Sequence, residues 1–323
     1  MSIRIAHFTD LHVTEPPGDI AWKDLLSKRF VGWLNLKLGG RHDAMSDAIR
    51  IARAFVEDIR EIDPDHVLFT GDVTGLSLPS EFERAHAILE PLVTAHNVTG
   101  IPGNHDVYVR SAVRRNLFDH WFGPWLQTDL RRRELPGPLQ SSYPLPLVRY
   151  VGDEVAIVCL QDSRPTWWHD SSGHVDDVQL RAAEHILTHV VADRVRILAL
   201  HYALRRPDGS PDTYLHRLRN AEDVLAMAAR TKVDLVVHGH IHHRAIQPTT
   251  QPTGPTATVT MPTVTMPTVT MANPGPLAFR NRARAYHIYT VESGRIALSA
   301  RRFDDASNRF VDWPDAPGAG PLA

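Results

Sequence analysis

The chain has 323 residues, of which 43% are hydrophobic and 22% are charged, as in ordinary globular proteins. This composition excludes a chain that is disordered throughout. The net charge of −2 provides no overall positive field for nucleic acid. A single cysteine, Cys159, excludes an internal disulfide framework. Because the first residues lack the apolar region of a signal peptide and no apolar run reaches the ~20 residues of a membrane span, we expect a cytoplasmic protein.

Short apolar runs that are bounded by turn residues predict buried strands along most of the chain. The predicted strands are Ile3–Phe8, Val67–Phe69, Asn97–Ile101, Val155–Leu160, Val195–Leu200 and Val233–Val237. Between them, helical patterns cover about Asp43–Ile62, Glu81–Ala95, Asp177–Val190 and Ala221–Thr231. Strands that alternate with helices in this way predict a mixed α/β sheet with helices outside.

The C-terminal third of the sequence differs from this pattern. Tyr286–Glu292 and Arg295–Arg301 flank Ser293-Gly294 and predict a hairpin. The segment 249–272 repeats the unit Thr-Val-Thr-Met-Pro, and its prolines predict a rim loop or an edge strand, with a binding strand as the alternative. Residues 313–323, rich in Pro, Gly and Ala, predict a flexible tail. We expect residues 1–312 to form one domain.

An insertion at residues 14–42 separates the first predicted strand from the first predicted helix. Its central part, 21–41, carries two tryptophans and several leucines together with five basic residues and one acidic residue. Such an amphipathic segment predicts a lid that buries its apolar face while its Lys and Arg side chains stay in water. The alternative is a lid that also makes a peripheral contact with a membrane or lipid.

Polar residues that can bind metals follow five of the predicted strands. These residues are Asp10, His12, Asp72, Asn104, His201, His240 and His242. They converge at one edge if the strands are parallel, because ligands bind beyond the carboxyl ends of such strands. Imidazole and carboxylate ligands without thiolate suit Zn, Fe, Mn or Co. Seven ligands are too many for one tetrahedral ion, so the set predicts two divalent ions that share one carboxylate.

The order Asp-x-His, Gly-Asp, Gly-Asn-His-Asp, His and Gly-His-x-His, from Asp10 to His242, resembles the calcineurin-like metallophosphoesterase family. The resemblance implies a two-sheet mixed β-sandwich that is flanked by helices on both outer faces, with the C-terminal hairpin in its second sheet. It also implies a hydrolase that cleaves phosphoric esters. A non-catalytic scaffold of the same fold is the minor alternative, and the complete ligand set argues against it.

The resemblance also implies a role for each matching residue. Asp10, His12 and His242 would bind the first metal, Asn104, His201 and His240 would bind the second, and Asp72 would bridge both. His105 would be the general acid that protonates the leaving oxygen, or a transition-state stabiliser, and Asp106 would orient it. Histidines outside the motifs, such as His216, are expected at the solvated surface. Tyr202, Arg205 and Arg206, which follow His201, are candidate substrate contacts because guanidinium groups match phosphate oxygens; the alternative is a solvated loop.

The substrate is the least specified part of the prediction. We expect a small-molecule phosphodiester similar to a cyclic nucleotide, or a phosphomonoester, that is attacked by a metal-activated hydroxide. The alternative is a nucleotide-lipid pyrophosphatase, such as one that cleaves UDP-2,3-diacylglucosamine at the membrane surface; the basic, Trp-containing insertion favours it. Nucleic acid is not favoured as a partner. The sequence does not predict the oligomeric state or the identity of the metals.

Overall fold

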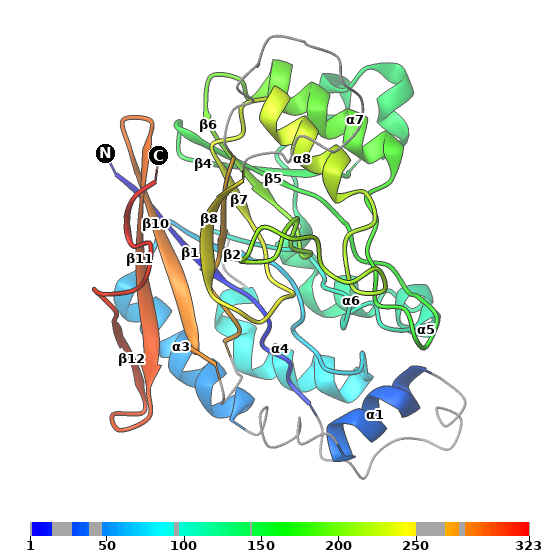
Figure 1. The fold of residues 1–323 in the computed structure, drawn as a ribbon, viewed down its shortest axis with the longest axis vertical. Helices are drawn as coiled ribbons and strands as arrows, with labels where there is room; N and C mark the ends of the chain where they lie inside the picture. Colours follow the sequence, from blue (N-terminus) through cyan, green and yellow to red (C-terminus); the bar gives the residue numbers. More distant parts are fainter. Residues whose placement is uncertain are drawn as a thin grey trace.

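The computed structural model of the chain describes residues 2–14, 28–38, 47–93, 97–142, 144–249, 269–277 and 282–322. Two β-sheets lie face to face within these residues, with helices outside them (Figure 1). The first sheet has the order β12 (Arg309–Asp312), β11 (Arg295–Asp304), β10 (Ala285–Glu292), β1 (Ile3–Phe8), β2 (His66–Phe69) and β3 (Val98–Gly100). The second has the order β4 (Leu147–Val151), β5 (Val155–Cys159), β6 (Val195–Ala199), β7 (Leu235–Val237), β9 (Val269–Asn273) and β8 (Ala245–Thr249).

The strand directions bring the ends of several strands to one edge. Strands β1, β2 and β3 are mutually parallel, and so are β5, β6, β7 and β9. Neighbouring parallel strands end at the same edge of a sheet, so the loops that follow them gather there. The hairpin of β10 and β11 pairs with β1. The expectation that this hairpin belongs to the second sheet is therefore wrong.

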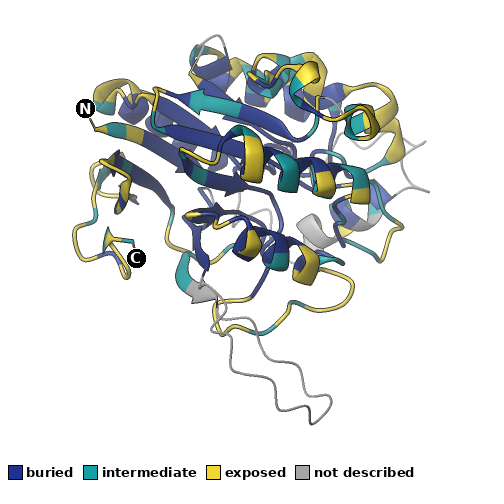
Figure 2. Ribbon diagram, turned by 90° about the horizontal axis from the view of Figure 1, so that it is seen from above, coloured by how far each residue is buried: buried dark blue, intermediate teal, exposed yellow. Residues whose placement is uncertain are grey.

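Helices cover the outer face of each sheet, which confirms the predicted sandwich (Figures 1 and 2). The helices, including short 3-10 and π turns, are α1 (Lys28–Leu38), α3 (Ala48–Ile62), α4 (Pro79–Val93), α5 (Arg110–Arg114), α6 (Leu117–Phe122), η2 (Gly123–Leu126), η3 (Arg132–Glu134), η4 (Gly137–Ser142), α7 (Asp177–His185), η5 (Ile186–Val190) and α8 (Ala221–Arg230). Within the described ranges, none of these helices is long and apolar enough to cross a bilayer.

Alternating side chains on each strand divide the hydrophobic core into three layers. On β1, Ile5 points into the layer between the two sheets, whereas Phe8 packs toward α3 and α4. On β6, Ile197 points into the layer between the sheets and Leu198 packs toward α7 and α8. Figure 2 shows the buried strands in the middle of the molecule, with exposed residues on the outer sides of the helices. The rigid sandwich thereby fixes the positions of the loops at its edge.

Two predictions for the C-terminal third differ from the structure. The last residues of the repeat segment belong to β9, which lies between β7 and β8 and is therefore an inner strand. This is possible because the residues that follow Pro267 alternate β-branched side chains without a proline. Residues 250–268 lie outside the described part of the chain. The expected flexible tail is instead attached to β11, because β13 (Gly320–Pro321) pairs with it and Leu322 N donates to Ile296 O at 2.8 Å.

In the described part of the insertion, α1, the basic residues Lys28 and Arg29 pack inward. Lys28 Nζ donates to Thr166 Oγ1 at 2.8 Å and to Asp170 O at 2.7 Å. Arg29 is also buried and donates to the carbonyls of Leu76 and Ser77. The expectation that the basic side chains stay in water is therefore wrong for these two residues, because backbone carbonyls of neighbouring loops satisfy their donors. Residues 15–27 and 39–46 of the insertion lie outside the described ranges.

A buried ion pair connects α3 to the hairpin, and it supports a prediction about stability. Arg301 donates to both oxygens of Asp58 at 2.7 Å, and Tyr286 Oη also donates to this carboxylate. Asp58→Ala leaves the guanidinium without its buried partner, so we expect the free energy of unfolding to fall by about 3–5 kcal/mol in urea titrations. The exposed Arg309–Glu61 pair provides the control, since Arg309→Ala should cost at most about 1 kcal/mol. Equal losses in the two variants would contradict this prediction.

Candidate metal centre

The loops at the edge of the sandwich hold their ligand residues in an unusual backbone conformation. The predicted ligands with a left-handed φ are Asp10 (53°), His12 (49°), Asp72 (66°), His240 (71°) and His242 (50°). Glycines allow these loops to approach one another closely. Gly71 has a φ of 104°, and a Cβ atom there would lie 2.5 Å from His201 Nδ1. A Cβ atom at Gly103 would lie 2.2 Å from Asp72 Oδ1.

The first group of donors contains Asp10, His12, Asp72 and His242. One donor atom from each residue lies within 4.8 Å of the others. His12 Nε2 is 3.0 Å from His242 Nε2, and His242 Nε2 is 3.3 Å from Asp10 Oδ1. Asp10, His12 and Asp72 are almost completely buried. Two imidazoles and two carboxylates that converge in a buried place match the ligand preferences of Zn, Mn, Fe or Co.

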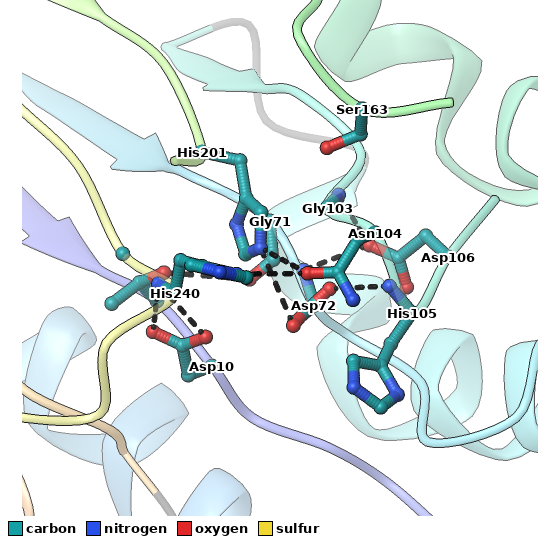
Figure 3. Close-up of polar contacts among 12 residues, drawn as sticks. Asp10, Gly71, Asp72, Gly103, Asn104, His105, Asp106, Ser163, His201 and His240 are labelled. Carbon is teal, nitrogen blue, oxygen red and sulfur yellow. Dashed lines mark hydrogen bonds and ion pairs between the residues drawn. The ribbon is translucent and has the colours of Figure 1, made fainter. Parts of the chain in front are cut away.

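The second group contains Asn104, His201 and His240, which lie next to the first group (Figure 3). Asn104 Oδ1 is 2.9 Å from His201 Nε2 and 3.0 Å from His240 Nδ1. His201 Nδ1 donates to Thr70 O at 2.8 Å, which directs the other ring nitrogen toward Asn104. Asp72 lies between the groups, with its Oδ2 atom 3.4 Å from His201 Nε2 and 3.6 Å from His12 Nε2. The structure therefore brings all seven predicted ligands together.

The charges of the two groups favour a cation between them. Burial opposes ionisation of Asp10, but His242, His12 and His201 hold the pKa of Asp10 well below its ordinary value. Burial also lowers the pKa of His201, yet the nearby Asp72 carboxylate outweighs burial and raises this pKa to about 10. The carboxylates thus attract positive charge at this place. A divalent cation supplies that charge to the same oxygen and nitrogen atoms, so the donor set fits a metal centre.

Asp106 has a different role from the predicted one, because it binds backbone groups of two loops. Its carboxylate accepts hydrogen bonds from the backbone N–H groups of Asp72, Val73, Thr74 and Gly103 at 2.9–3.2 Å and from the Thr74 hydroxyl. Burial raises the pKa of Asp106 to about 6. His105 Nδ1 instead donates to Gly75 O at 2.5 Å, so a backbone carbonyl orients this imidazole. The expectation that Asp106 orients His105 is not supported.

The position of Asp106 leads to a prediction that separates a structural role from a catalytic one. Asp106→Asn replaces one acceptor oxygen with an NH₂ group that would face backbone N–H donors. Each buried donor left without an acceptor costs about 1–3 kcal/mol, so we expect a clear loss of thermal stability together with weaker metal binding. Calorimetry and elemental analysis measure these two quantities. Unchanged stability and metal content with lower turnover would instead indicate a direct catalytic role.

His216 belongs to the site, and its side chain is also exposed, as its sequence context predicted. Its carbonyl oxygen lies 2.8 Å from His240 Nε2 and can accept a hydrogen bond from it. Its Nδ1 lies 3.0 Å from the same His240 atom and 3.0 Å from Asp212 Oδ2. A proton on Nε2 would leave Nδ1 of His240 as the nitrogen that faces Asn104. No sequence pattern indicated this contact, because His216 lies in the long loop between β6 and α8, far along the chain from the end of β6.

An open cavity of about 840 Å³ lies above the ligands. Asp72, Asn104, His105, His240 and His242 contribute to its wall, and so does Arg206. The other two candidate substrate residues do not line it. Arg205 is buried and pairs with Glu222 at 2.6 Å, while the buried Tyr202 ring packs against His240 at a centroid distance of 4.2 Å. Of the three candidates, only Arg206 is therefore placed for contact with a substrate.

Two solved structures of other proteins have a similar fold. A dimetal phosphatase from Danio rerio is similar at 11% identity and a TM-score of 0.59, over 96% of this chain and 98% of that chain. The purple acid phosphatase PPD1 from yellow lupin (Lupinus luteus) seeds is similar at 13% identity and a TM-score of 0.52, over 97% of this chain and 53% of that chain. At these identities the likeness shows the fold alone. No curated protein sequence matches the chain significantly.

The family model supplies the assignment, since it covers about three quarters of the chain. The model described as calcineurin-like phosphoesterase matches residues 3–244, a range that contains all seven ligands and His105. The resemblance seen in the sequence is thereby confirmed. The chain belongs to the calcineurin-like phosphoesterase family and is a metal-dependent phosphoester hydrolase.

Proposed function

We propose that this protein hydrolyses a small-molecule phosphodiester, similar to a cyclic nucleotide, or a phosphomonoester, with two divalent ions per chain. The observation that carries the proposal is the position of Asp72. Its Oδ2 atom faces His12 of the first donor group and His201 of the second, at 3.6 and 3.4 Å. One carboxylate oxygen between two ligand groups is the arrangement that a pair of ions sharing one ligand requires.

Each donor group has enough ligands for one ion. Asp10, His12 and His242 would hold the first ion, Asn104, His201 and His240 would hold the second, and Asp72 would contact both. When bound, such ions lower the pKa of water toward neutrality and offset negative charge on the phosphoryl oxygens. Asp10 has a second function in the loop geometry, because its carboxylate accepts a hydrogen bond from His240 N at 3.1 Å. This contact ties the loop after β1 to the loop after β7.

His105 is placed to transfer a proton to the leaving group. It lines the cavity and is not among the donor atoms of either group. Because Nδ1 donates to Gly75 O, the proton that His105 exchanges with a substrate is carried on Nε2. The imidazole also stacks on Tyr108 at a centroid distance of 5.2 Å and an interplanar angle of 11°. A fixed ring with a defined exchangeable proton suits general acid catalysis.

A substrate panel at one fixed Mn²⁺ concentration tests the proposal. The panel contains p-nitrophenyl phosphate, bis(p-nitrophenyl) phosphate, a cyclic nucleotide and a UDP-linked lipid in detergent. We expect turnover of at least one of the three soluble substrates, complete loss after EDTA treatment, and recovery when Mn²⁺ is restored. Absence of turnover on all three, for protein that contains two metal ions per chain by elemental analysis, would contradict the proposal.

A nucleotide-lipid pyrophosphatase is the second candidate, because part of the insertion lies beside the cavity wall. Lys28 Nζ of α1 is 4.5 Å from the ring centroid of Tyr108, which lines the cavity. A Cβ atom at Gly32 of α1 would lie 2.9 Å from Tyr108 Oη, so the helix is packed closely against this wall. Turnover of the UDP-linked lipid alone in the panel would favour this candidate over soluble diesters and monoesters.

A further inference from the structure

The cavity is much larger than the metal centre, so its walls must contact the organic part of a substrate. Cavities of about 300–1,000 Å³ typically bind molecules of the size of a nucleotide or drug, and this cavity of about 840 Å³ is within that range. The metal ligands occupy one side of it. Two loops also contribute to its wall, namely residues 160–176 between β5 and α7, and residues 200–220 between β6 and α8. The side chains of these loops therefore face whatever is attached to the phosphorus.

Trp168 is the large aromatic residue of this wall. It lines the cavity, and yet 62% of its surface is exposed. Tryptophan normally buries most of its area, so a ring that is exposed inside a substrate cavity offers an uncovered apolar face to a ligand. The neighbouring Trp167 is 69% exposed and is not part of the cavity wall. The two adjacent tryptophans thus have similar exposure, but only Trp168 lines the cavity.

The turn that carries Trp168 is held in place by several hydrogen bonds. Asp170 N donates to Trp167 O at 3.0 Å, which closes a turn with Trp168 and His169 at its tip. Ser171 N donates to Leu215 O at 2.8 Å and fixes this turn to the second loop. Lys28 Nζ of α1 donates to Asp170 O at 2.7 Å. These hydrogen bonds fix the backbone that carries the indole at the cavity wall, so no loop ordering is needed when a ligand packs on the ring.

We propose that Trp168 is a specificity-determining residue, and that its indole stacks on a planar ring that the phosphoester carries. This inference rests on the proposed function, because the phosphate must be held by the metal centre while the ring reaches Trp168. A nucleobase and a simple aryl group share the required flat π surface. Stacking of a base on an aromatic side chain tolerates different bases, because every base has such a surface.

Kinetic measurements on three variants test the proposal. Trp168→Ala should lower kcat/KM for bis(p-nitrophenyl) phosphate and for a nucleoside cyclic phosphate by about tenfold or more, as expected for loss of one stacking contact. It should change kcat/KM for glycerophosphocholine, a diester without a ring, by less than about twofold. Trp168→Phe should retain most of the activity, and Trp167→Ala is the matched control that should change none of these values. If Trp168→Ala lowers kcat/KM for the nucleoside cyclic phosphate alone, the site binds a nucleobase. If it lowers kcat/KM for both ring-containing substrates, the site binds aryl groups in general.

A binding measurement separates this proposal from the proposed function. AMP and inorganic phosphate are titrated into the Mn²⁺-loaded protein by calorimetry. Trp168→Ala should weaken AMP binding by about tenfold and leave phosphate binding unchanged. If phosphate does not bind to the wild-type protein, the proposed function itself fails. Equal effects of Trp168→Ala on ring and non-ring ligands would overturn the stacking role. A different outcome would indicate a lipid-contacting surface and overturn the stacking role. In that outcome, Trp168→Ala leaves kcat/KM for the ring-containing substrates unchanged, and Trp167→Ala and Trp168→Ala weaken binding to phosphatidylglycerol vesicles equally.

Discussion

Replacing Asp72 with alanine should abolish phosphoester hydrolysis and remove at least one metal ion from each chain. The carboxylate faces both donor groups, at 3.6 Å from His12 and 3.4 Å from His201, so neither group keeps its full set without it. Its Oδ1 atom also accepts a hydrogen bond from His105 N at 2.8 Å, which ties the loop after β3 to the loop after β2. The expected phenotype therefore combines the loss of a negative charge between the donor groups with a displacement of His105.

Elemental analysis of the purified variant, beside activity on the most active substrate of the panel, measures this effect. Asp72→Asn is the matched control for folding, because asparagine has the same shape and tolerates the left-handed φ of 66° at this position. We expect Asp72→Asn to fold like the wild type and still lose metal and activity. Two metal ions per chain in Asp72→Ala would refute the shared-ligand role.

Replacing His105 with alanine should lower turnover by about two orders of magnitude or more while both metal ions remain bound, since general acid catalysis contributes about 10²–10⁴-fold. His105 lies in the cavity wall, and its hydrogen bond to Gly75 leaves Nε2 as the proton-exchanging atom. The loss should be smaller for p-nitrophenyl esters than for alkyl esters, because a good leaving group needs less protonation. This dependence on the leaving group identifies a general acid.

Steady-state kinetics on both ester types, together with metal content, decides the role of His105. His169→Ala is the matched control, since His169 also lines the cavity but lies on a different loop, next to Trp168. We expect little change in kcat for that variant. Turnover of His105→Ala at the wild-type level would rule out the catalytic role, and loss of metal would show that His105 acts through the ligand loops.

The sequence predicted the parts of the fold that depend on local patterns. The segments of β1, β5 and β6 are rich in β-branched and aliphatic residues, and their positions agree with the predicted strands within about a residue. The start of α7 also agrees with the predicted start at Asp177, and Asp176 stabilises it as an N-cap by accepting hydrogen bonds from Val178 N and Gln179 N. The inner position of β9 was not predicted, because this strand follows a proline-containing repeat that indicated a rim loop or an edge strand.

The ligands of the site were predictable for a different reason than its supporting residues. Ligands such as Asn104 follow strands and lie in short motifs, so their position along the chain reveals them. The role of Asp106 depends on which backbone groups surround it, and the contact of His216 with His240 joins residues 24 positions apart. Arg205 looked like a phosphate ligand, but Glu222 on α8 pairs with it. Tertiary contacts of this kind leave no pattern in a single sequence.

The left-handed backbone at the five predicted ligand positions lowers the stability of the folded protein. Each L-residue in this conformation costs roughly 1–2 kcal/mol relative to a helical or extended one, although aspartate tolerates it better than most residues. Five such positions together cost an amount comparable to the entire net stability of a typical domain, about 5–15 kcal/mol. Selection for thermostability alone would therefore favour glycine or asparagine at these positions. Such replacements would remove the predicted metal ligands and, with them, the activity. An engineering programme for a hardier enzyme should leave these five positions unchanged and seek stability in the helices far from this edge.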